Sequence, residues 1–309
     1  MPKRSLQGII VALVTPFQPD ERIDFGAWQK IIDALIAAGV DGLMACGSTG
    51  EFYTLNAEER TVAFRFCRQA AGRRVPVYAN VGCVTTRETI QLALAAQAEG
   101  IAALAVITPY YIKASQAELA DHYIEVCRAV HLPVLAYNFP QHGGTEVLPA
   151  TVAQIAARCE NFVGVKDSGG HLDQAIAYRN AAPGRDLAVF VGPERLLLPA
   201  LANACAGVIS GCANIVPQLL VNLHRAFQEG RLDEAARLQT LTSELAELVS
   251  LHTFPGVIKE AMAMSGLPAG NCRKPVGPMP PAARESVARM LAKLQKEGLL
   301  PVPAQASIS

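Results

Sequence analysis

Lys166 follows a short apolar run and precedes a turn of small residues, a pattern that can place an amine in a buried site. Residues 162–165 (Phe-Val-Gly-Val) are partly β-branched and are closed by the turn at 167–170, so they are expected to form a buried strand. Desolvation at the end of such a strand disfavours a charged amine. A neutral amine can attack a ketone and form a Schiff base. The alternative is a strand-end lysine that simply reaches solvent.

Hydroxyl groups stand after other apolar runs, where they can assist such an amine. Ser48 and Thr49 follow the run 42–46, and Tyr137 ends the run 133–137. A phenol can supply the acid–base step that dehydrates a carbinolamine. The turn with Ser48 and Thr49 offers backbone N–H groups and hydroxyls that suit a carboxylate. Turn capping and aromatic packing are the structural alternatives for these residues. The joint occurrence of the hydroxyl groups with a lysine favours the chemical interpretation.

Eight short apolar runs separated by helical segments predict the fold that must position these groups. The expected strands are 8–14, 42–46, 75–81, 101–107, 133–137, 162–165, 187–191 and 207–210. Strands that alternate with helices predict a parallel sheet covered by helices, and about eight such units predict closure into an α/β fold, the (β/α)8 TIM barrel. An open doubly wound sheet is the alternative. It favours a glycine-rich phosphate turn after the first strand, and Val-Thr-Pro-Phe at 14–17 is not one.

The helical segments divide the chain into two predicted parts. Residues 1–230 are expected to form the barrel, and residues 231–309 a C-terminal extension with helices at 232–250, 256–265 and 282–295. In a TIM barrel the active site lies at the carboxyl ends of the strands. Ser48, Tyr137 and Lys166 are therefore expected to meet at one mouth.

Composition excludes several classes of function. Apolar residues make up 51% of the chain, which is enough for a large core, and 27 basic residues balance 27 acidic ones. This balance argues against nucleic acid or an anionic membrane as the main partner. No apolar run is long enough to span a bilayer, and the start of the sequence lacks the apolar core of a signal peptide. The eight cysteines include no Cys-x-x-Cys pair, so we expect reduced core residues of a cytoplasmic protein.

Four motifs in order resemble those of the dihydrodipicolinate synthase/N-acetylneuraminate lyase family. They are Gly-Ser-Thr-Gly-Glu at 47–51, Thr-Pro-Tyr-Tyr at 108–111, Tyr-Asn-Phe-Pro at 137–140 and Gly-Val-Lys-Asp-Ser-Gly-Gly at 164–170. Each motif alone is weak, but four in this order and spacing are specific, and the similarity spans residues 6–295. The resemblance implies a TIM barrel with three extra helices, a Schiff base with a pyruvate-type substrate, and a homotetramer.

The same resemblance implies roles for individual residues. Lys166 corresponds to the Schiff-base lysine and Tyr137 to the proton shuttle. Ser48 and Thr49 correspond to the groups that hold the substrate carboxylate, with Ser48 also in a hydroxyl relay. Tyr111 corresponds to the residue that completes this relay from a neighbouring subunit.

The backbone at Gly192 and Ile209 is expected to border the pocket, and no metal or organic cofactor is implied.

Two departures from the family pattern bear on the substrate. His142 stands where dihydrodipicolinate synthases typically carry an arginine for the semialdehyde carboxylate, and a histidine cannot form the same bidentate contact. Residues 192–195 (Gly-Pro-Glu-Arg) and Gly211 replace the residues with which N-acetylneuraminate lyases hold sugar hydroxyls. His142 and Arg195 are therefore expected to bind a second carboxylate or a hydroxylated tail.

The sequence thus predicts a class I aldolase or lyase that acts on a 2-oxo acid and releases or uses pyruvate. The lysine motif is most similar to the catabolic aldolases, including 4-hydroxy-2-oxoglutarate aldolase. Dihydrodipicolinate synthase and a 2-keto-3-deoxy sugar-acid dehydratase share the same imine and stay open as alternatives. A phosphosugar isomerase on the same barrel needs a phosphate loop after the seventh and eighth strands. Pro-Glu-Arg at 193–195 is a poor loop of this kind, but Gly211 keeps this alternative open. A non-catalytic binding protein on the same barrel predicts no covalent adduct with pyruvate.

Overall fold

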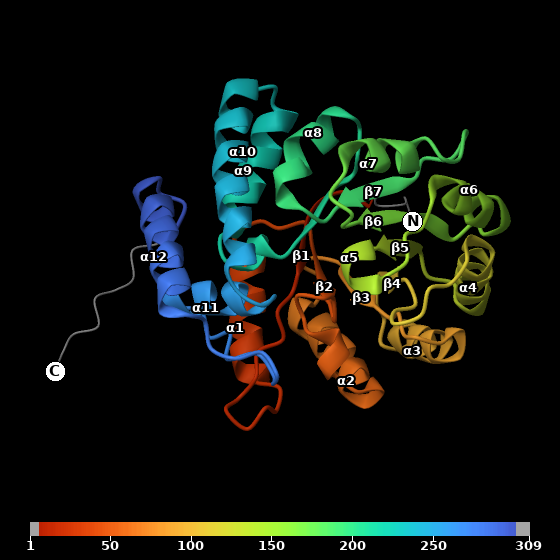
Figure 1. Cartoon of the computed structure of the whole chain (residues 1–309), viewed down its shortest axis with the longest axis horizontal. Helices are drawn as coiled ribbons and strands as arrows, with labels where there is room; N and C mark the ends of the chain where they lie inside the picture. The colour runs from red at the N-terminus through yellow and green to blue at the C-terminus, as the bar shows by residue number, and fades with distance from the viewer. Residues whose placement is uncertain (1–5, 301–309) are drawn as a thin grey trace.

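A closed barrel of eight parallel strands forms the centre of the molecule (Figure 1). The computed structural model describes residues 6–300. The strands are β1 Gly8–Ala12, β2 Gly42–Ala45, β3 Val77–Asn80, β4 Ala103–Ile107, β5 Val134–Asn138, β6 Phe162–Asp167, β7 Ala188–Val191 and β8 Gly207–Ser210. Each strand pairs with the next in the chain, and β8 pairs with β1 to close the barrel. The predicted (β/α)8 fold is confirmed.

Helices follow the strands and cover the barrel. They are α1 Phe25–Ala37, α2 Ala57–Ala71, α3 Thr86–Ala98, α4 Gln116–Ala129, α5 Pro140–Gly143, α6 Pro149–Arg158, α7 Leu172–Arg179, α8 Leu197–Ala202 and α9 Pro217–Gln228. Short 3-10 helices lie at η1 Phe52–Thr54, η2 Glu194–Leu196 and η3 Cys212–Asn214.

The starts of several helices are set by side-chain caps that the sequence already indicates. Asn56 accepts a hydrogen bond from the backbone of Glu59 at 2.8 Å, and Glu59 accepts one from the backbone of Asn56 at 3.0 Å. This reciprocal capping box satisfies two N–H groups that a helix start leaves unpaired. Asp24 caps α1 in the simpler way, through the N–H of Ala27 at 2.9 Å.

Three further α-helices form the C-terminal extension: α10 Leu232–Glu247, α11 Gly256–Met264 and α12 Pro281–Lys296, with the 3-10 helix η4 Leu248–Leu251 after α10. Figure 1 shows them gathered on one side of the barrel, with α12 outermost. Helix α10 packs against α9 and η2, and α11 packs against η3 and η4. Because η2 and η3 follow β7 and β8, the extension reaches the carboxyl end of the barrel. The ends of the two predicted parts, 1–5 and 301–309, lie outside the described residues.

Several elements differ from the predicted ones. Strand β6 runs to Asp167 rather than Val165, because Lys166 and Asp167 continue the pairing with β5 and β7. The segment between β7 and β8 holds two elements, the 3-10 helix η2 and α8. Helix α5, a single turn over Pro140–Gly143 that is capped by the left-handed Gly144, was not predicted.

The interior of the barrel is closely packed, and its strands are almost wholly buried. All eight cysteines are free thiols; six are buried, and Cys83 and Cys272 are partly buried. No helix within residues 6–300 is both long and apolar enough to cross a membrane.

Candidate active site

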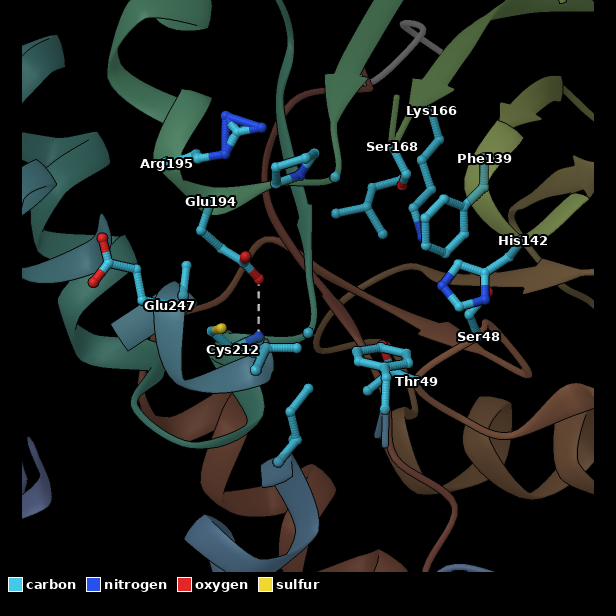
Figure 2. A pocket seen from close by; sticks show the side chains of 18 of the residues that line it. Ser48, Thr49, Phe139, His142, Lys166, Ser168, Glu194, Arg195, Cys212 and Glu247 are labelled. Carbon is cyan, nitrogen blue, oxygen red and sulfur yellow. Dashed lines mark hydrogen bonds between the residues drawn. The ribbon is translucent and has the colours of Figure 1, made fainter. Parts of the chain in front are cut away.

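A pocket of about 400 Å³ opens at the carboxyl end of the barrel strands. Eight of the nine predicted site residues line it: Ser48, Thr49, Tyr137, His142, Lys166, Gly192, Arg195 and Ile209. The C-terminal extension supplies the remaining wall with Ser243, Ala246, Glu247, Val249, Phe254 and Ile258. Figure 2 shows Lys166, Phe139 and His142 on one side of this pocket and Arg195 and Glu247 on the other.

Lys166 and Tyr137 lie side by side because β5 and β6 pair in register at these two residues. Residues paired on neighbouring parallel strands point to the same face of the sheet, so both side chains enter the barrel mouth. Lys166 is only 3% exposed, and its Nζ lies 3.9 Å from the centre of the Tyr137 ring. Among the ion pairs of residues 6–300, none includes Lys166. The amine is buried without a carboxylate partner.

The Tyr137 hydroxyl connects this pair to the turn after β2. It lies 3.1 Å from the Ser48 Oγ, and both residues are buried. Gly50 is required in this turn, because a Cβ there would lie 2.8 Å from the carbonyl oxygen of Leu13. The carbonyl of Gly50 in turn accepts a hydrogen bond from the Thr15 hydroxyl at 2.7 Å. The turn is therefore held tightly against the segment that follows β1.

Asn138 and Asp167, the next residues along β5 and β6, fix the positions of Tyr137 and Lys166. Asn138 Nδ2 donates to Asp167 Oδ1 at 2.8 Å, and the backbone N–H of Gly169 donates to the same oxygen at 3.0 Å. Burial raises the pKa of Asp167, and the Asn138 hydrogen bond opposes this shift. The sequence analysis quoted both residues within motifs but gave them no role. An amide and a carboxylate at the ends of two adjacent strands could have indicated this contact.

Gly192, after β7, allows a close approach of the chain to the site. Its N–H donates to the carbonyl of Asp167 at 2.6 Å. A Cβ at Gly192 would lie 2.1 Å from the Ser168 Oγ, so a larger residue would displace this hydroxyl. Ser168 itself lines the pocket and was not predicted as a site residue.

His142 and Arg195 line the outer part of the pocket. The His142 ring lies on α5, with its centre 4.3 Å from that of Phe139. Burial lowers the pKa of His142, which favours the neutral form of this side chain at pH 7. Arg195 is exposed, and its Nη2 donates to the carbonyl of Gly170 at 3.0 Å. Arg195 therefore both borders the pocket and reaches solvent.

Tyr111 is the predicted site residue that does not line the pocket of its own chain. Its side chain is 98% exposed, and its φ of 74° is unusual for a bulky residue. The predicted place for Tyr111 is a neighbouring subunit's site, so this role stays a prediction.

Glu194 and the C-terminal extension are further parts of the site that were not predicted from the sequence. The Glu194 carboxylate is 7% exposed, and one of its oxygens accepts from the Ser210 hydroxyl at 2.7 Å and from the N–H of Cys212 at 2.9 Å. The second contact is drawn in Figure 2. Glu194 thus joins the segments after β7 and β8. No local pattern in the sequence shows that helices beginning 38 or more residues after this glutamate would close the pocket.

The arrangement suits carbonyl chemistry with an amine. It brings together an unpaired buried amine, a phenol hydrogen-bonded to a serine, and a turn with two hydroxyls. An amine nucleophile beside an acid–base group is the pattern of covalent catalysis. Within residues 6–300, no cluster of three His, Cys, Asp or Glu side chains has an arrangement that suits a metal ion.

Comparisons with known proteins agree with this geometry. Residues 5–294 match the model of the dihydrodipicolinate synthetase family. A 4-hydroxy-tetrahydrodipicolinate synthase of Chlorobium phaeobacteroides is 35% identical over 294 residues, which cover 95% of this chain and 99% of that protein. The synthase of the same name from Moorella thermoacetica is 36% identical and covers 94% of this chain and 98% of its own length.

Solved structures are similar over nearly the whole chain. YagE, a prophage protein of this family from E. coli solved with pyruvate, has a TM-score of 0.90 and 35% identity, covering 96% of this chain and 99% of that one. The chloride-inhibited dihydrodipicolinate synthase of Acinetobacter baumannii, also solved with pyruvate, has a TM-score of 0.90 and 30% identity, with coverage of 96% and 100%.

Proposed function

The chain belongs to the dihydrodipicolinate synthetase family, whose members are class I lyases that form a lysine Schiff base with pyruvate, and from this premise we propose that Lys166 is its Schiff-base residue. The proposed reaction is the cleavage of a 2-oxo acid, of the 4-hydroxy-2-oxoglutarate type, to pyruvate and an aldehyde. The observation that carries the proposal is the unpaired, buried Lys166 amine beside Tyr137, whose hydroxyl lies 3.1 Å from that of Ser48.

The first step is formation of the iminium. The neutral Lys166 amine attacks the 2-oxo carbon, and Tyr137 supplies the proton with which the carbinolamine oxygen leaves as water. Ser48 and Thr49 hold the substrate carboxylate in this step, through their hydroxyls and the N–H groups of the turn. Tyr111 of a neighbouring subunit completes the proton relay with Ser48 in a homotetramer. This assembly and the cytoplasmic location stay predictions.

Cleavage follows from the iminium. Tyr137 accepts the proton of the 4-hydroxyl group, the bond between C3 and C4 breaks, and its electron pair enters the iminium to form an enamine. The aldehyde product leaves, and Tyr137 passes the proton that it accepted to C3. Water then hydrolyses the iminium to pyruvate and free Lys166, and the proton released in this step restores the Tyr137 hydroxyl. For 4-hydroxy-2-oxoglutarate the aldehyde is glyoxylate, which keeps the second carboxylate. Over the whole cycle Tyr137 thus gives a proton twice and takes one back twice.

The outer pocket favours an anionic tail on the substrate. Arg195 offers a permanent cation at the rim, and its remaining guanidinium donors are free of any carboxylate within the described residues. Charge-assisted contacts of arginine with carboxylates are among the stronger hydrogen bonds in proteins. The proposal therefore selects a substrate with a second carboxylate over a neutral sugar acid.

A second candidate is 4-hydroxy-tetrahydrodipicolinate synthase, because relatives 35% and 36% identical carry that name. His142 is the observation against it, since a histidine whose pKa is lowered by burial gives the semialdehyde carboxylate no cation at neutral pH.

The test compares kcat/KM for cleavage of 4-hydroxy-2-oxoglutarate with kcat/KM for condensation of aspartate semialdehyde with pyruvate. The aldolase proposal expects efficient cleavage and poor condensation. Efficient condensation that neither Arg195→Ala nor His142→Ala changes would replace the proposal with the synthase.

A further inference from the structure

A buried ion pair joins the turn that carries Ser48 and Thr49 to the C-terminal extension. Glu51, in this turn, is fully buried, and Lys259, on α11, is 2% exposed. The Lys259 Nζ lies 2.5 Å from Glu51 Oε1. None of the steps proposed above uses either residue.

Both oxygens of the Glu51 carboxylate are held by the extension. Oε1 faces Lys259, and Oε2 accepts from the backbone N–H of Arg273 at 3.0 Å. Lys259 also donates to the carbonyl of Asn271 at 2.9 Å and lies 4.3 Å from the centre of the Phe17 ring. The pair is therefore embedded in contacts that fix both partners.

The turn is held in a backbone conformation that needs such support. Cys46 and Glu51, at its two ends, each have a φ of 54°, in the left-handed region that residues with a Cβ rarely adopt. A strained conformation of this kind persists only where the surroundings fix it. Ser48 and Thr49 lie between these two residues, so the placement of their hydroxyls depends on how the ends are held.

Helix α11 also reaches the pocket directly, next to Lys259. Ile258 lines the pocket, and a Cβ built on Gly211 would lie 3.0 Å from Ile258 Cδ1 and 3.2 Å from Thr49 Oγ1. Thr49 and α11 therefore approach the same point of the barrel rim. A shift of α11 would displace the side of the pocket on which Thr49 lies.

Stability alone does not account for an ion pair at this place. Removing two charges from water is costly, and well-packed apolar residues of similar volume often stabilise a protein as well or better. We propose that Glu51 and Lys259 are positioning residues, which hold the turn so that Ser48 and Thr49 bind the substrate carboxylate. The extension then sets the affinity for the 2-oxo acid. This inference rests on the proposed function.

The test separates position from stability with a neutral pair. Glu51→Gln combined with Lys259→Met removes both charges, so no buried charge is left unpaired. The expected result is a native-like melting temperature together with a half-saturating pyruvate concentration for borohydride trapping at Lys166 that rises about tenfold or more, because small misplacements can cost up to about a hundredfold. The rate at saturating pyruvate is expected to change less.

A matched control lies on the same helix. Glu260 forms an ion pair with Arg284, with 2.6 Å between Oε1 and Nη1, and lines no part of the pocket. Glu260→Gln should leave the half-saturating pyruvate concentration at the native value. If the double variant does not fold, Glu51→Gln alone serves as the second variant. It keeps an acceptor for Arg273, and Lys259 can lose its proton because burial lowers its pKa.

Native half-saturation in a folded double variant, or in folded Glu51→Gln, would overturn the inference and leave the pair with a structural role only. The native enzyme would still be labelled in that case. Absence of any adduct on the native enzyme would instead overturn the proposed function.

Discussion

Two lysines are buried at the same end of the barrel, and they differ in whether a carboxylate lies beside the amine. Lys166 is 3% exposed, has no carboxylate partner within residues 6–300, and its Nζ lies 3.9 Å from the centre of the Tyr137 ring. Lys259 is 2% exposed and lies 2.5 Å from the Glu51 carboxylate. An aromatic face attracts a cation far less than a carboxylate does. At similar burial, one amine therefore has no counter-charge and the other is ion-paired with a carboxylate.

This difference shows that burial of a lysine does not by itself indicate catalysis. What distinguishes Lys166 is its position on a central strand without a counter-charge, beside a phenol that is itself hydrogen-bonded. Lys259 comes from a helix outside the barrel, and its charge is balanced by the residue it fixes. Matched substitutions of the two lysines and of their neighbours test this difference.

The largest effect is expected from Lys166→Met. Turnover should fall to the background rate, because no amine is left to form the imine. The free energy of unfolding should stay within about 1.5 kcal/mol of the native value, because methionine keeps most of the volume and leaves no buried charge unpaired. Steady-state kinetics and urea denaturation measure the two quantities. Residual turnover above background would remove Lys166 from the mechanism.

Tyr137→Phe should lower kcat by about 10²–10⁴-fold, the usual contribution of a general acid–base group, while the fold is kept. Tyr110→Phe is the matched control, since Tyr110 follows β4 and does not line the pocket. It should leave kcat unchanged. A Tyr137→Phe variant with a kcat within about twofold of the native value would have lost far less than this range, and the shuttle role would then be wrong.

Lys259→Met should lower the stability of the protein but keep imine formation, the reverse of what is expected for Lys166→Met. We expect a loss of about 3–5 kcal/mol in the free energy of unfolding, because Glu51 is left buried without its partner. Pyruvate should still be trapped at Lys166 in the folded protein. Urea denaturation of the two methionine variants side by side makes the comparison, and a loss below about 1 kcal/mol, typical of exposed pairs, would show that the ion pair is not held as described.

A smaller effect is expected at the rim. Arg195→Ala should cost about 1.5–3 kcal/mol in kcat/KM for 4-hydroxy-2-oxoglutarate if the arginine makes a charge-assisted contact. His142→Ala should cost only about 0.5–1.5 kcal/mol at pH 7, as for a neutral hydrogen bond. Because burial lowers the pKa of His142, its protonated form becomes populated only in more acidic solution. The contribution of His142 to kcat/KM should grow there. Equal effects of the two variants at pH 7 would contradict this assignment.

The sequence identified the barrel half of the site because the active groups directly follow apolar strands. Ser48 and Lys166 could be placed at one mouth from chain order alone, once eight βα units were recognised. The ion pair between Glu51 and Lys259 could not be predicted in this way. A lysine on a helix is usually exposed, and its partner lies in a turn more than two hundred residues earlier.

The outer half of the pocket was predictable only in part. His142 and Arg195 were placed by the family resemblance, at positions that follow strand ends, but the helical turn that carries His142 was not predicted. The wall from α10 and α11 depends on how the extension packs over the barrel. Tertiary packing of this kind leaves no periodic signal in the sequence.

The most direct test of the central claim is covalent trapping of the native enzyme. The protein is incubated with pyruvate and borohydride, and intact-mass analysis is followed by peptide mapping of both buried lysines. The account predicts one adduct per chain on Lys166, none on Lys259, and none on either residue in Lys166→Met. An adduct on Lys259, an adduct that persists in Lys166→Met, or no adduct on the native enzyme would contradict it.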